Sequence, residues 1–295
     1  MNIANQTKIL SGLFGMTDSV TLLAESGFDC IDVTFSEPDL ECWLKDTSYN
    51  KQAAELKKHA DALGVCFHQA HAPTPSDGAD EAYNQDVYQK ILRTIELSSI
   101  LGIQNVVLHP RDFVRYLGTY EETRDRLRGV NLEFFNSLLP YCKDYNVGVV
   151  VENTYWGTDN GIEQSYCSNA KDIVDLVDTL DSPYMGACLD LGHLALAKQP
   201  HDAVIAALDG NRLKCLHVQD NEGVKDIHLL PGLGTVDYDM CMRSLAQIDY
   251  QGVLTLESYG FIKGFEKAFL PQVLKFMATR ARFLAEQFEM HKKGM

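Results

Sequence analysis

The chain has 295 residues, of which 45 % are hydrophobic and 23 % are charged, an ordinary balance for a globular protein. Its formal net charge of −15 argues against broad nucleic-acid binding, because an acidic surface repels phosphate groups. No apolar run approaches the roughly 18 residues of a membrane-spanning helix. The N-terminus also lacks the pattern of a secretion signal. We therefore expect a cytoplasmic enzyme.

The eight cysteines form no C-x-x-C pair. Several of them lie inside apolar runs that predict strands, such as GACLD and LKCLHV. We therefore expect buried free thiols rather than disulfides or redox chemistry.

Short apolar runs alternate with amphipathic stretches along the whole chain. The runs lack strict apolar–polar alternation, which is typical of parallel strands covered on both faces. In chain order, the predicted strands cover residues 8–16, 28–35, 64–71, 104–110, 147–154, 185–193, 213–220 and 252–259. The predicted helices between them include residues 18–27, 51–64, 81–102 and 169–180. Eight strand-then-helix units in a chain of this length predict a single (β/α)8 TIM barrel, and we expect one domain over residues 1–295.

An open, doubly wound sheet is the alternative fold for alternating strands and helices. It needs a glycine-rich phosphate-binding turn after an early strand, and the segment GLFGMTD at residues 12–18 lacks the G-x-G-x-x-G spacing. The longest predicted loops follow strands two to five, at residues 36–50, 72–80, 111–120 and 155–168. In a barrel these loops lie on the carboxyl face, where such enzymes place their chemistry.

Side chains that can bind metal end six successive predicted strands. They are His71, His109, Glu152, Asp190 with His193, His217 with Asp220, and Glu257. One such residue alone more often has a structural role, but in a barrel these six positions meet at one mouth. Burying three carboxylates together is costly without a cation. We therefore predict a site for one divalent ion, formed by Glu152, Asp190, His217 and Glu257. Oxygen donors with one imidazole suit Mn, Mg, Co, Fe or Zn.

The short motifs around these residues have a recognisable order. They are VVVENT at Glu152, CLDLGH at Asp190, LHVQDN at His217, DIHLLPGLGTVDYD starting at Asp226, and LTLES at Glu257. In this order and spacing they make the chain resemble the xylose-isomerase-like barrel superfamily of sugar isomerases and epimerases, which also contains endonuclease IV. The resemblance covers nearly the whole length and is strongest from 148 to 259.

The resemblance implies an aldose–ketose isomerase or a ketose epimerase for a sugar or sugar phosphate, working by proton transfer through a metal-stabilised enediolate. Glu152 and Glu257 would be the catalytic residues that move protons on opposite sides of the sugar. The residues expected to contact the substrate are His71, His109, His193, His228 and Trp156. The expected partner is a small carbohydrate rather than nucleic acid or a membrane, and a homo-oligomer is left open.

Two features keep other functions open. Gly223 stands where tagatose-type epimerases carry an arginine, six residues after the seventh-strand histidine. The three zinc sites of endonuclease IV can also be placed on the chain, as His71, His109 and Glu152, as Glu152, Asp190, His217 and Glu257, and as His193, Asp226 and His228. The alternatives are thus a phosphodiesterase with a three-zinc cluster and a barrel that binds metal without catalysis. The acidic charge and the few basic residues in the mouth loops favour the sugar enzyme.

Overall fold

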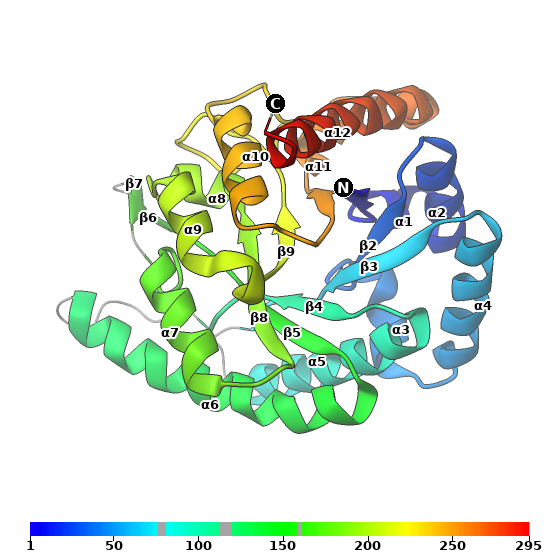
Figure 1. Ribbon diagram of the computed structural model, residues 1–295. Coiled ribbons are helices and arrows are strands. Elements are labelled where there is room, and N and C mark those ends of the chain that lie inside the picture. Colours follow the sequence, from blue (N-terminus) through cyan, green and yellow to red (C-terminus); the bar gives the residue numbers. More distant parts are fainter. Residues whose placement is uncertain (76–80, 112–119, 159–160, 164, 295) are drawn as a thin grey trace.

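The computed structural model describes residues 1–75, 81–111, 120–158, 161–163 and 165–294. Within them, eight parallel strands form a nearly closed barrel with helices around it (Figure 1). The strand order is β10-β1-β2-β3-β4-β5-β8-β9, and a parallel bridge between Val218 and Leu256 joins the two edges. The predicted TIM barrel is therefore confirmed.

The barrel strands are β1 (Ile3–Gln6), β2 (Cys30–Thr34), β3 (Cys66–His71), β4 (Asn105–Leu108), β5 (Gly148–Glu152), β8 (Met185–Asp190), β9 (Leu213–His217) and β10 (Leu254–Leu256). A short antiparallel hairpin, β6 (Trp156–Thr158) and β7 (Gly161–Glu163), lies in the long loop after β5. Seven of the predicted strands contain an observed barrel strand, but the first does not.

The first strand was predicted at residues 8–16, and that prediction is wrong. The strand is β1 at Ile3–Gln6, and the helix α1 occupies Leu10–Phe14 instead. Apolar character does not mark β1, because Asn5 and Gln6 are polar and yet buried. The sequence of a barrel strand need not be an apolar run when its inward side chains lie near a polar mouth.

The helices are α1, α2 (Met16–Glu25), α3 (Glu41–Lys45), α4 (Tyr49–Ala62), α5 (Glu81–Leu101), α6 (Tyr120–Tyr145), α7 (Ala170–Leu180), α8 (Leu191–Leu196), α9 (His201–Arg212), α10 (Tyr238–Gln247), α11 (Tyr259–Ile262) and α12 (Leu270–Lys292), with 3-10 turns η1 (Pro38–Leu40) and η2 (Lys267–Phe269). The four helices predicted from the sequence agree with α2, α4, α5 and α7 to within two residues at each end. Among the described residues, no helix has both the length and the apolar character needed to cross a bilayer.

The inward positions of the strands explain how the fold builds a site. Side chains alternate along a strand, so residues two apart point to the same side. Four inward residues, one on each of β4, β5, β8 and β9, pack together as a buried layer: Val107, Val150, Cys188 and Cys215. Two residues further along the same strands come His109, Glu152, Asp190 and His217. The barrel therefore places these four side chains together at its carboxyl mouth.

Candidate metal centre

Four buried side chains meet at the carboxyl mouth of the barrel. They end β5, β8 and β9 and directly follow β10: Glu152, Asp190, His217 and Glu257. Each offers one ligand atom, and the four atoms all lie within 4.8 Å of one another. The structure thus brings together the set of residues that the sequence pattern singled out, and we call these four residues the central set.

His217 lies in the middle of the central set. Its Nδ1 is 2.9 Å from Glu152 Oε1 and 3.1 Å from Glu257 Oε2. Its Nε2 is 3.2 Å from Oδ2 of Asp32 on β2. A carboxylate on the far nitrogen fixes the orientation and tautomer of a histidine ligand and increases its basicity. His217 can therefore donate Nε2–H to Asp32 and present Nδ1 to an ion.

Asp32 is a functional candidate that the sequence patterns missed. It is fully buried in the middle of β2, and Gln69 Nε2 donates to its Oδ2 at 3.0 Å. The only local signal was an acidic residue at the centre of the run FDCIDVTF, which also contains Asp29. Its role depends on contact with His217, which lies 185 residues away along the chain.

We expect Asp32→Asn to weaken binding of a divalent ion by about 10- to 100-fold, because a neutral amide orients His217 less firmly and lowers its basicity. Competition with a chromophoric chelator measures the affinity. Asp39→Asn is the matched control, since Asp39 is exposed on η1. Equal affinity in the two folded variants would contradict the role of Asp32.

One oxygen of each carboxylate in the central set lacks a hydrogen-bond donor within the described residues. Asp190 Oδ2 is buried and makes no hydrogen bond within the described part of the chain. Glu152 Oε2 and Glu257 Oε2 face imidazole nitrogens without hydrogen-bond geometry. Unsatisfied buried carboxylate oxygens cost free energy, and a divalent cation is the partner that such oxygens commonly bind. The donor set therefore fits a divalent ion.

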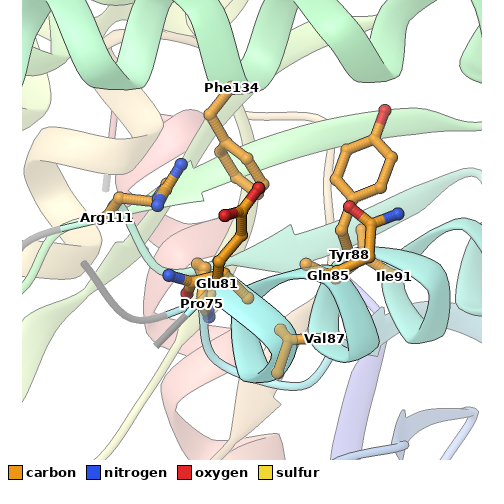
Figure 2. A pocket seen from close by; sticks show the side chains of 9 residues that line it. Pro75, Glu81, Gln85, Val87, Tyr88, Ile91, Arg111 and Phe134 are labelled. Atoms are coloured by element: carbon orange, nitrogen blue, oxygen red, sulfur yellow. The ribbon is translucent and has the colours of Figure 1, made fainter. Parts of the chain in front are cut away.

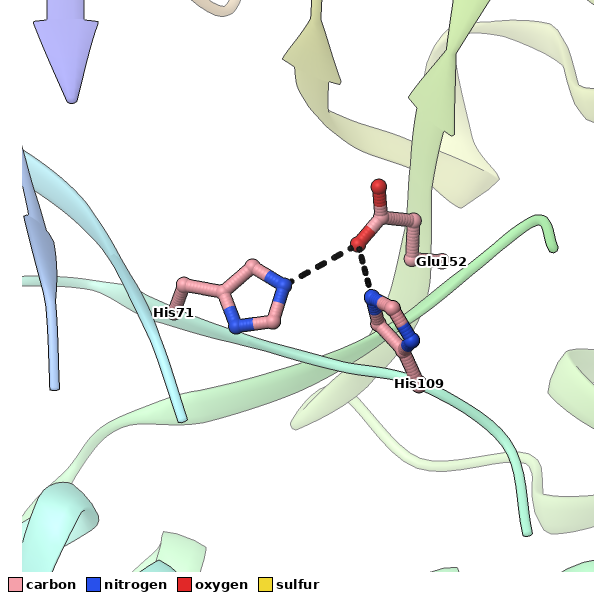
Figure 3. Close-up of side chains that lie close together, drawn as sticks. All are labelled: His71, His109 and Glu152. Carbon is pink, nitrogen blue, oxygen red and sulfur yellow. Dashed lines mark ion pairs between the residues drawn. The ribbon is translucent and has the colours of Figure 1, made fainter. Parts of the chain in front are cut away.

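A second group adjoins the first through Glu152. Its Oε2 lies 3.3 Å from His71 Nε2 and 3.2 Å from His109 Nε2, and both nitrogens point to this one oxygen (Figure 3). Two ligands of one tetrahedral zinc ion are about 3.4 Å apart, given metal–ligand bonds of 2.0–2.2 Å. His71, His109 and Glu152 are thus spaced like ligands of a common ion.

A third group involves the loop between β9 and α10. Asp226 Oδ2 is 2.9 Å from His228 Nε2 and 3.5 Å from Nε2 of His193, which lies on α8. One ligand atom from each of the three residues lies within 4.8 Å of the others. Their geometry also allows an ordinary ion pair between Asp226 and protonated histidines.

Backbone carbonyls orient three of the outer histidines in the same way. Nδ1 of His71, His193 and His228 lies 2.8 Å from the carbonyl oxygen of Ala72, Asn153 and Glu257, respectively. Donation from Nδ1–H leaves Nε2 free to act as an acceptor or ligand. In each case Nε2 faces a carboxylate at the mouth, so these side chains are held in position to bind an ion or a substrate oxygen.

Two amide side chains hold Asp190 in place. Asn153 accepts from the backbone N–H of Asp190 at 2.7 Å and donates to its carbonyl at 2.9 Å. Gln219 Nε2 donates to Asp190 Oδ1 at 3.2 Å and to Asp226 Oδ1 at 3.0 Å. Gln219 thus connects the central set with the third group. Neither amide was identified from the sequence.

Burial and charge shift the pKa values of the central set in different directions. Burial raises the pKa of Asp190 to about 7, against the attraction of His193. Burial also disfavours the carboxylate of Glu152, but His217 and His109 outweigh it and hold the pKa well below its usual range. Burial opposes a charge on His217, yet its acidic neighbours, Glu257 and Glu152 among them, raise its pKa well above the ordinary value. The buried carboxylates of the central set thus strongly favour positive charge in the site.

Aromatic and basic side chains flank the outer histidines. The Tyr259 ring stacks on His228 with centroids 4.0 Å apart, and the Tyr155 ring lies 5.2 Å from that of His193. Lys8 Nζ lies 4.0 Å from the Tyr259 ring centroid and 3.8 Å from Glu257 Oε1. Trp156, an expected substrate contact, begins β6, but its side chain lies outside the described residues.

A separate hollow of about 390 Å³ lies beside α5 and α6 (Figure 2). Glu81, Tyr88, Arg111 and Phe134 contribute to its lining. None of the residues that line it belongs to the three metal-capable groups. The hollow is therefore not part of the candidate centre.

Proteins similar to this chain include both enzyme classes that its motifs implied. A D-psicose 3-epimerase of Enterocloster bolteae is 26 % identical, over 79 % of this chain and 73 % of its own length. A probable endonuclease 4 of Mesomycoplasma hyopneumoniae is 29 % identical, over 42 % of this chain and 40 % of its own length.

The solved structures agree on the fold. The IolI protein, crystallised with a binding zinc atom, superposes with a TM-score of 0.75 at 17 % identity, covering 98 % of each chain. The family model described as xylose isomerase-like TIM barrel matches residues 20–278. The barrel, the metal-capable residues at its strand ends and the sequence match all agree, and this chain belongs to the xylose isomerase-like TIM barrel family.

Proposed function

We propose that the chain is a divalent-metal-dependent isomerase or epimerase of a sugar or sugar phosphate, with one catalytic domain over residues 1–295. The observation that supports this most is the central set, in which three buried carboxylates and one imidazole meet. The set has too few hydrogen-bond donors for all of the carboxylate oxygens. Similarity to a D-psicose 3-epimerase over most of both chains supports the substrate class.

The central set would hold one ion of Mn, Mg, Co, Fe or Zn. When bound, the ion would supply Lewis-acid stabilisation for loss of a proton beside a carbonyl, the step that leads to an enediolate. Glu152 and Glu257 would take and return the protons. Each of these carboxylates has an oxygen within 3.1 Å of His217 Nδ1, so both lie beside the expected ion. They would act on opposite sides of the sugar.

The outer histidines His71, His109, His193 and His228 would donate to or accept from sugar hydroxyl groups. The rings of Tyr155 and Tyr259 flank two of them, and aromatic faces suit the apolar face of a sugar. Gly223 has no side chain with which to replace the arginine of tagatose-type epimerases. We therefore propose that the sugar is held in a pose that differs from theirs.

A second candidate function is a phosphodiesterase with three zinc ions, and a specific observation favours it. All three ligand groups of the endonuclease pattern are assembled, with Glu152 shared between two of them. A phosphodiester reaction needs several cations around the phosphorus and the leaving oxygen. The net charge of −15 opposes approach of DNA, so we rank this function second.

Metal number separates the two functions. For the sugar enzyme we expect one tightly held divalent ion per chain and no cleavage of DNA at abasic sites. Elemental analysis of desalted protein gives the number of ions, and a nicking assay on a synthetic abasic duplex gives the activity. Three zinc ions together with nicking would establish the phosphodiesterase instead. Three ions without nicking would contradict the single-ion prediction and leave the isomerase chemistry without support.

A further inference from the structure

Two cysteines come together at the end of the barrel opposite the candidate metal centre. Cys30 and Cys66 are the first residues of β2 and β3, and they are paired in register. Their Sγ atoms are 2.7 Å apart. Neighbouring strands lie about 4.8 Å apart, which is within the range of Cα separations that a disulfide can bridge. The backbone therefore already places the two residues as a cystine requires.

The pair combines an exposed thiol with a buried thiol that is in contact with it. Six of the eight cysteines are buried, and the exposed ones are Cys42 and Cys66. Cys30 is buried with Ala4 and Val253, whereas Cys66 is exposed to solvent. Cys66 can therefore react with a reagent from solution, while Cys30 is already in contact with Cys66.

The contact between the two sulfur atoms also gives Cys66 and Cys30 different chemical roles. The hydrogen bond from Cys30 lowers the pKa of Cys66 to about 7, and the same contact, with burial, raises the pKa of Cys30 far above its usual range. An attacking thiol is most effective when its pKa lies near the ambient pH. Cys66 is therefore the nucleophile and Cys30 the resolving thiol.

We propose that Cys30 and Cys66 form a reversible dithiol–disulfide site that small-molecule disulfides oxidise. The Cys66 thiolate attacks one sulfur of the small disulfide, forms a mixed disulfide and releases the first small thiolate. Cys30 then loses its proton, and its sulfur attacks Cys66 Sγ and releases the second small thiolate. Both protein thiols are oxidised, one small disulfide is reduced to two thiols, and the two protons end on these products. The described structure has all eight cysteines as free thiols, as expected, and the proposal concerns only the redox chemistry of this pair; it does not depend on the proposed function.

The cysteine pair lies next to an irregular part of the pairing between β2 and β3. The pairing of β2 with β3 shifts by one residue just after Ile31, so that Asp32 pairs with Gln69. The Gln69–Asp32 hydrogen bond lies in this shifted segment, two residues beyond Cys30. A covalent bond between Cys30 and Cys66 ties the two strands together at the start of that segment.

Oxidation of the full-length protein by oxidised glutathione tests the proposal. After alkylation of the remaining thiols, we expect two of the eight cysteines to be lost per chain. A non-reduced digest should contain the Cys30 peptide linked to the Cys66 peptide. Reduced glutathione in excess should restore both thiols. Adducts confined to Cys42, with Cys30 and Cys66 unlinked, would overturn the proposal.

Variants separate the two steps. Cys30→Ser should accumulate one glutathione on Cys66, because no resolving thiol remains, whereas Cys66→Ser should leave Cys30 unmodified. Cys42→Ser is the matched control and should form the linked peptide as the wild type does. The rate of the first step should rise with pH around a midpoint near 7, below the value of about 8.5 for an ordinary thiol. A midpoint at the ordinary value, or linkage of Cys30 to any other cysteine, would contradict the assigned roles.

Discussion

Replacement of Glu152 by glutamine is expected to reduce proton exchange at the substrate carbon by about a hundred- to ten-thousand-fold, the usual contribution of a general base. The amide keeps the size of the carboxylate and one oxygen for coordination, but it cannot accept a proton. Glu152 lies at the end of β5. Its Oε1 faces His217, and its Oε2 faces His71 and His109. Neither of the other two carboxylates in the central set contacts both His217 and the pair formed by His71 and His109.

Deuterium incorporation from heavy water, measured by mass spectrometry against a panel of ketoses and their phosphates, gives the rate. Glu55→Gln is the matched control, since Glu55 is exposed on α4 and pairs with Lys51 at the surface. Bound metal is measured in each variant, so that loss of the ion is distinguished from loss of the base. Undiminished exchange in a folded, metal-loaded Glu152→Gln protein would rule out the proton-transfer role.

Removal of the metal should abolish activity and lower the melting temperature together. Three buried carboxylates then repel one another, and their pKa values shift upward relative to the metal-bound state. An ion present at a thousand times its dissociation constant stabilises the folded state by about 4 kcal/mol, which corresponds to roughly 10 °C for a domain of this size. This loss is large because the ligands are buried and cannot be solvated.

Calorimetry before and after chelation, with elemental analysis to verify removal, measures the shift. Re-addition of each candidate ion should restore both melting temperature and exchange activity, and the most effective ion identifies the cofactor. Asp190→Asn should show a smaller shift on chelation than the control Asp39→Asn, because it lacks one charged ligand. An unchanged melting temperature after verified removal would contradict a buried site on the central set.

The sequence by itself determined the barrel and the metal-capable residues at the strand ends. Both follow from local patterns, because continuous apolar runs mark parallel strands and the polar residues near the end of each run lie at the carboxyl mouth whatever the details of packing. Glu152, Asp190, His217 and Glu257 could be found in this way. The first strand could not, since β1 contains the polar residues Asn5 and Gln6.

Only the tertiary structure decided which side chains act on one another. Asp32 on β2 contacts His217 on β9, a strand with which β2 does not pair, and Cys30 contacts Cys66 through the pairing of β2 with β3. The register of such pairings, including the one-residue shift between β2 and β3, depends on how all eight strands close into a barrel. No local pattern contains that information, because a register shift of one residue turns a side chain from the interior to the outer face of the barrel.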